Sequence, residues 1–192
     1  MNTLDKVVEV LRRPGTIGVI PTDTVYGLVA NAHDAVATKR LYDLKSRENK
    51  PGTIIAASID QLAKLGLKQR YLKAVIDYWP GPISIIIPCG PELSYLHAGK
   101  NSLAVRLPSD EALVDFLEQI GPLVTTSANH PNEPVAATIE QAHGYFGDKV
   151  DFYVDGGDLS DRQPSTIIRV VDDAIEVLRK GAVKIENNAV VR

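Results

Sequence analysis

Short apolar runs alternate along this chain with stretches in which apolar residues recur every three or four positions. The first pattern predicts buried strands and the second predicts helices packed on a sheet. The predicted helices are 4–11, 34–44, 58–65, 71–78, 109–120 and 138–146. The predicted strands are 17–20, 53–57, 83–87, 103–107, a strand through Leu123 and Val124, 152–154, 166–171 and 174–178.

Helix-capping residues support several of these elements. Side chains that can accept from the first free N–H groups of a helix stand at three predicted starts: Asp34, Ser58 and Thr138. In the helix after Asp34, the spacing predicts that Val36, Leu41 and Leu44 face the core.

The order of the elements indicates a mixed α/β sheet. Strands and helices alternate through the first part of the chain, whereas 166–171 and 174–178 are joined at Asp172-Asp173 as in a hairpin. A purely parallel sheet does not accommodate a hairpin, so a mixed sheet is expected. No linker or repeat divides the sequence, and a single domain over residues 1–192 is expected.

Composition narrows the function classes. With 192 residues, 44% of them hydrophobic, the chain can bury a substantial core, and its net charge of −3 argues against nucleic-acid binding through bulk positive charge. One cysteine, Cys89, excludes an internal disulfide, and no chemical signature around it indicates a nucleophile. Without an apolar run long enough for a membrane span, we expect a cytoplasmic protein that makes no membrane contact.

Polar side chains follow two of the predicted strands at the points where they end. Thr22, Asp23 and Thr24 come after the strand 17–20, and the segment 125–129, Thr-Thr-Ser-Ala-Asn, comes after Val124. Open α/β sheets bind ligands at strand ends, although Thr and Ser also cap helices there. Two such segments together favour a binding site.

Cations complete this candidate site. Lys45 and Arg47 stand near the end of a predicted helix, where they can either offset the helix dipole or bind phosphate; Lys50 adds to the charge. Arg106 ends a strand on which Ser102 shares its face. A charged residue at the end of an apolar strand is usually solvated, and the alternative is that Arg106 holds a carboxylate.

The chemistry indicated is transfer of a phosphoryl or nucleotidyl group. Asp23 is the best-placed candidate for a general base, with the alternative that it orients Thr22 or Thr24. The four histidines lack metal-ligand spacing, so we expect no metal held by protein alone; Mg²⁺ carried by a nucleotide needs few protein ligands. Many donors without an acid–base pair suit a reaction governed by positioning and charge stabilisation.

Seven segments, taken in order, resemble the motifs of the YrdC-like family, the threonylcarbamoyl-AMP synthases. They are Pro21–Leu28, Lys45-x-Arg47, Trp79–Pro82, Ser102–Arg106, Thr126–Asn129, Pro164–Thr166 and Leu178-Arg179-x-Gly181. The chain departs from the family pattern at Glu48, where proline is usual. It resembles the short branch of the family, which lacks an additional C-terminal domain.

The resemblance implies a twisted open sheet with a positively charged concave face. It also implies the conversion of L-threonine, bicarbonate and ATP to threonylcarbamoyl-AMP and pyrophosphate, which supplies a tRNA threonylcarbamoyl transferase complex. The implied ATP ligands are Lys45, Arg47, Ser102, Ser127, Asn129 and Arg179, with Mg²⁺ bound through the nucleotide. The implied threonine ligands are Thr22, Thr24, Arg106 and Ser165.

Two other functions remain open from the sequence. The same basic face could bind tRNA or rRNA as its main role, in an RNA-binding module or a ribosome maturation factor, and weak RNA binding could accompany the enzyme activity. The second alternative is a carbamoyl-adenylate enzyme like the YrdC-like domains of hydrogenase maturation proteins. Those domains accompany zinc-finger and acylphosphatase-like segments, which this chain lacks.

Overall fold

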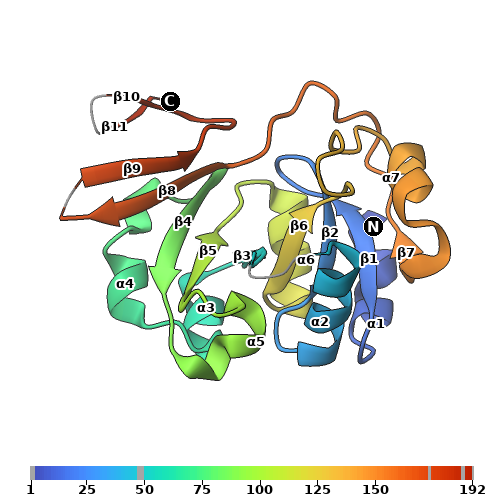
Figure 1. Cartoon of the computed structure of the whole chain (residues 1–192), viewed down its shortest axis with the longest axis horizontal. Coiled ribbons are helices and arrows are strands. Elements are labelled where there is room, and N and C mark those ends of the chain that lie inside the picture. Colours follow the sequence, from blue (N-terminus) through green and yellow to red (C-terminus); the bar gives the residue numbers. More distant parts are fainter. Residues whose placement is uncertain (1–2, 47–49, 173, 187–188, 192) are drawn as a thin grey trace.

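A large mixed sheet forms the centre of the molecule. The computed structural model describes residues 3–46, 50–172, 174–186 and 189–191. Within them, nine strands form one sheet in the order β7-β1-β2-β6-β3-β5-β4-β8-β9 (Figure 1). These are β1 (Ile17–Pro21), β2 (Tyr26–Asn31), β3 (Thr53–Ile55), β4 (Ile83–Pro88), β5 (Ser102–Arg106), β6 (Leu123–Ser127), β7 (Phe152–Tyr153), β8 (Thr166–Val171) and β9 (Ala174–Arg179).

The sheet combines both strand directions. β1 pairs parallel with β7 and antiparallel with β2, and β3 pairs parallel with β5 and antiparallel with β6. β4 pairs parallel with β8, and β8 continues into β9 as an antiparallel hairpin. The mixed α/β sheet and the late hairpin expected from the sequence are therefore confirmed.

Helices cover both faces of the sheet. They are α1 (Val8–Leu11), α2 (Ala35–Leu44), α3 (Ile59–Leu65), α4 (Gln69–Lys73), α5 (Ser94–His97), α6 (Glu111–Ile120) and α7 (Ile139–Phe146). Short 3₁₀ turns cover Thr3–Val7, Ile76–Tyr78, Pro91–Leu93 and Gly147–Lys149. The caps Asp34, Ser58 and Thr138 are confirmed, and the helix predicted over 109–120 begins at Glu111 with Asp110 as its cap.

The core lies in two layers because neighbouring strand residues point to opposite faces. Val19 and Ile54 belong to the layer under α2, α3 and α5. Ile20 and Ile55, the next residue in each case, belong to the layer under α1 and α6. Burial on both faces explains why the central strands are almost continuously apolar.

The structure differs from the sequence predictions at several elements. The predicted helix 4–11 is a 3₁₀ turn, Thr3–Val7, followed by α1. Val36 is 70% exposed, because the buried face of α2 begins one residue later at Ala37. Strand β2 was not expected, since its residues follow directly on a polar motif. The predicted helix 71–78 consists of α4 and a separate 3₁₀ turn. After β9, β10 (Lys184–Glu186) and β11 (Ala189–Val191) form an unexpected second hairpin.

Candidate active site

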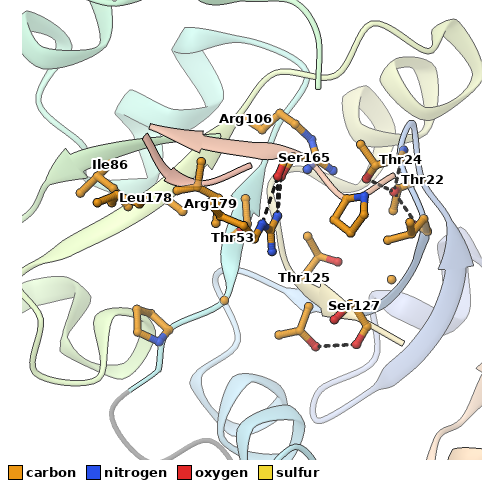
Figure 2. Close-up of a pocket in the computed structure, with 18 of the residues that line it drawn as sticks. Thr22, Thr24, Thr53, Ile86, Arg106, Thr125, Ser127, Ser165, Leu178 and Arg179 are labelled. Carbon is orange, nitrogen blue, oxygen red and sulfur yellow. Dashed lines mark hydrogen bonds between the residues drawn. The ribbon is translucent and has the colours of Figure 1, made fainter. Parts of the chain in front are cut away.

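A cavity of about 420 Å³ opens over the middle of the sheet. Its walls come from the β1–β2 turn, β5, β6 and the β8–β9 hairpin (Figure 2). Seven residues proposed from the sequence line it: Thr22, Thr24, Ser102, Arg106, Ser127, Ser165 and Arg179. Segments far apart in the chain therefore meet in one cavity.

The hydroxyls of the β1–β2 turn have a defined hydrogen-bond direction. Thr22 Oγ1 donates to the Val25 carbonyl at 2.7 Å, which uses its only proton. The contact of 3.0 Å between Thr22 Oγ1 and Thr24 Oγ1 must then be a donation from Thr24. Thr24 Oγ1 is left with acceptor capacity only, so this part of the cavity suits a ligand that donates a hydrogen bond.

Contacts with the segment 155–162 hold this turn in place. The Tyr26 hydroxyl donates to the Gly157 carbonyl and accepts from the Gly156 N–H, both at 2.8 Å. Arg162 Nη1 donates to the Thr22 carbonyl at 3.0 Å. The pKa of Tyr26 is raised, chiefly by burial, so its hydroxyl remains a donor.

Lys45 supports the cavity from behind Ser127. Its side chain is buried, with Nζ donating to the Ser127 carbonyl at 2.9 Å, to Asn129 Oδ1 at 2.8 Å and to the Asn129 carbonyl. Ser127 Oγ donates to the same Asn129 Oδ1 at 2.8 Å. Lys45 and Asn129 are not among the residues that line the cavity. Arg47, the second cation of the motif, and Glu48 lie outside the described residues.

Ser165 lies at the centre of a second hydrogen-bond network. Its hydroxyl is 2.8 Å from the hydroxyl of Ser84 on β4. Arg179 on β9 reaches Ser165 with Nη2, which lies 2.7 Å from the Ser165 carbonyl and 3.0 Å from its hydroxyl, and with Nε. Figure 2 shows the hydrogen bonds between Arg179 and Ser165 as dashed lines.

Arg106 reaches the cavity from the end of β5 and forms an ion pair with Asp23. Arg106 Nη2 lies 2.9 Å from Asp23 Oδ1, and both side chains are 4% exposed. Burial raises the pKa of Asp23 despite the opposing effect of Arg106, and burial lowers the pKa of Arg106. Asp23 itself does not line the cavity, which places it behind Arg106 rather than at the ligand position.

Sequence reasoning missed other residues of the lining. Lys100 precedes a predicted strand, and Arg169 follows Ile167 by two positions on β8, so strand alternation could have placed Arg169 on the same face. With Arg106 and Arg179, four cations line the cavity, and no Asp or Glu does so within the described part of the chain. Apolar side chains flank them: Ile86, Ile167 and Leu178. The lining therefore suits an anionic ligand with an apolar part.

A family model described as telomere recombination, Sua5/YciO/YrdC, matches residues 10–181. The chain belongs to the Sua5/YciO/YrdC family. A Klebsiella pneumoniae protein named threonylcarbamoyl-AMP synthase is 36% identical over 156 residues, which cover 77% of this chain and 80% of that protein. A Bacillus subtilis protein of the same name is 31% identical over 179 residues, covering 90% of this chain and 52% of that protein.

Solved structures agree with this membership. The crystal structure of Pyrococcus abyssi Sua5 complexed with L-threonine matches 94% of this chain with a TM-score of 0.81 and 28% identity. The chain spans 55% of that structure. The fold predicted from the resemblance is therefore confirmed; the sign of the charge on the whole concave face stays a prediction.

Proposed function

We propose that this protein is an L-threonylcarbamoyladenylate synthase. One observation carries the proposal: the cavity over the sheet brings together threonine and serine hydroxyls, a buried arginine and three further cations, and no acidic residue lines it within the described part of the chain. Relatives named threonylcarbamoyl-AMP synthase, and a related structure complexed with L-threonine, support it over an RNA-binding module.

The threonine end is proposed to lie between the β1–β2 turn and Ser165. Arg106 would bind the carboxylate, since a guanidinium pairs with two oxygens at once. Thr24 Oγ1 would accept from the amine, in agreement with its free acceptor capacity. Thr22 fixes Thr24, and Ser165 closes this end with a hydroxyl held by Ser84 and Arg179.

The nucleotide is proposed to occupy the rest of the cavity. Ser102, Ser127 and Arg179 line it directly. Lys45 and Asn129 lie behind Ser127, and to act as phosphate ligands they would have to exchange their present contacts with each other and with Ser127 for contacts to the nucleotide. Arg47 is proposed as a further phosphate ligand. No group of three or more His, Cys, Asp or Glu in the described residues could hold a metal, so Mg²⁺ would arrive on the ATP phosphates and neutralise part of their charge.

The residues would act by positioning and by neutralising charge. Threonine amine and bicarbonate give a carbamate and water. A carbamate oxygen then bonds to the α-phosphorus of ATP while the bond to the pyrophosphate oxygen breaks, giving threonylcarbamoyl-AMP and pyrophosphate. Cations stabilise the charge that develops on the leaving group, and this requires no acid–base pair.

The wider role is proposed on the same basis. The product would pass to a tRNA threonylcarbamoyl transferase complex in the cytoplasm, with any RNA contact weak, and residues 1–192 would act as one domain. No helix in the described residues is long and apolar enough to cross a membrane.

The test is pyrophosphate release from ATP by the purified protein. Release should require L-threonine and bicarbonate together and should be unaffected by added tRNA. Release that is independent of threonine would contradict the proposed function. Steep, salt-sensitive tRNA binding without any turnover would favour the RNA-binding alternative.

A further inference from the structure

The ion pair between Asp23 and Arg106 lies in the interior of the protein, not on its surface. Both side chains are 4% exposed, and the pair is held by a contact of 2.9 Å between Nη2 and Oδ1. Arg106 Nε has no hydrogen-bond partner among the described residues, nor does Asp23 Oδ2. A buried pair with unsatisfied atoms contributes little net stability, so its placement needs another explanation.

The surroundings of the pair show which side is open to a ligand. Arg106 lines the cavity and Asp23 does not. Figure 2 shows the Arg106 side chain reaching toward the end of the cavity where Thr22 and Thr24 are drawn. Asp23 is therefore the anchor on the protein side of the guanidinium, and Arg106 is the member of the pair that lines the cavity.

We propose that Asp23 is a positioning residue, which fixes the Arg106 guanidinium so that its remaining donors meet the substrate carboxylate. This inference rests on the proposed function. It replaces the role of general base for Asp23, because a residue that does not line the cavity cannot take a proton directly from a ligand there. A guanidinium held in advance loses less conformational freedom when the ligand binds.

Equilibrium binding of L-threonine, and separately of ATP, by calorimetry tests this inference without relying on turnover. Asp23→Asn keeps the size of the side chain but removes its charge. We expect the Kd for threonine to rise about tenfold and the Kd for ATP to change less than twofold, because a neutral acceptor holds a guanidinium less firmly than a carboxylate.

A nearby acid provides the control. Asp110 raises the pKa of Asp23 through its like charge, but its own carboxylate caps α6 by accepting from the Leu113 N–H at 2.9 Å. Asp110→Asn keeps a good capping residue and removes one negative charge, so both dissociation constants should stay within twofold. If Asp23→Asn does not fold, Asp23→Glu takes its place, with the same selective loss of threonine affinity expected because the longer side chain displaces the guanidinium.

The outcomes separate the inference from the function on which it rests. If the unmodified protein binds no threonine, the proposed function fails. If it binds threonine but the Asp23 variant binds equally well or more tightly, Asp23 only competes with the substrate carboxylate, and the positioning role is wrong. Equal losses for threonine and ATP would indicate a merely structural role.

Discussion

Gly181 lies directly against the backbone of Pro164 and Ser165. A Cβ at this position would overlap the Pro164 carbonyl oxygen and would lie 2.6 Å from the Ser165 carbonyl carbon. The next residue continues the contact, with the Ala182 N–H donating to the Pro164 carbonyl at 2.9 Å. The segment after β9 is therefore packed onto the residue pair that brings Ser165 to the cavity.

Gly181→Ala should loosen this contact because the obstacle is backbone, which cannot rotate away. We expect a loss of about 1–3 kcal/mol in the free energy of unfolding, measured by urea denaturation, together with weaker threonine binding. Gly144→Ala is the matched control. Gly144 lies within α7 with open space around its Cβ position, so alanine should stabilise by about 0.5–1 kcal/mol. Equal stability of the Gly181 variant would contradict the packing argument.

Lys45→Met should reduce both activity and stability. The buried ammonium donates to two carbonyls and to the Asn129 amide oxygen, and its loss removes a charged donor from each of these acceptors, at a cost of about 2–4 kcal/mol. Lys39→Met in α2, the helix that Lys45 follows, removes an exposed lysine that pairs only with Asp43 within the described residues. Its effect should stay within about 0.5 kcal/mol. Chemical denaturation of both variants decides whether Lys45 has this structural role besides any contact to phosphate.

The two partners of the Ser165 hydroxyl should be distinguishable by kinetics. Ser84→Ala removes one partner of that hydroxyl and should raise the KM for threonine about threefold while leaving the KM for ATP unchanged. Arg179→Ala also removes a cation from the cavity and should raise both constants. Steady-state kinetics with each substrate varied in turn measures the difference. Identical patterns in the two variants would mean that Arg179 acts only through Ser165.

The single cysteine should be unreactive in the folded protein. Burial, with a smaller effect from Glu92, raises the pKa of Cys89 to about 11. At pH 8 the thiolate fraction should be about 100-fold lower than for a thiol of pKa 9, and iodoacetamide labelling should be slower to a similar degree. Because the folded pKa is raised, the neutral thiol stabilises the fold below about pH 9, and that contribution is lost as the pH rises toward 11. Rapid labelling of the native protein at pH 8 would contradict this.

Much of the fold could be predicted because the capping residues and the apolar pattern of the sequence agree with the helix starts and the buried strands of the structure. The caps Asp34, Ser58 and Thr138 begin their helices as expected, and the apolar run 83–87 is the core of strand β4. Strand β2 escaped prediction because its polar neighbours obscured the alternation. The prediction that Val36 faces the core was wrong, because periodicity alone does not fix which side of the first helical turn faces the sheet.

The site could be predicted only in part. Motif residues at strand ends, such as Thr22 and Ser165, do line the cavity. The pairing of Asp23 with Arg106 joins residues 83 positions apart in sequence and depends on tertiary structure, as do the contacts of Lys45 with Asn129. Lys100 and Arg169 belong to no motif. Strand alternation could have placed Arg169 on the face of Ile167, but that this face of β8 and the residue before β5 border the same cavity depends on tertiary structure.

The central claim is that this cavity joins carbamoylated threonine to AMP, and isotope incorporation measures this directly. The protein would be incubated with ATP, Mg²⁺, L-threonine and ¹³C-bicarbonate. The products would be separated by chromatography and their masses measured by mass spectrometry. We predict an adduct with the mass of threonylcarbamoyl-AMP that carries one ¹³C atom and forms in step with pyrophosphate. Pyrophosphate release accompanied by AMP alone, with no labelled adduct even at the earliest times, would contradict the claim.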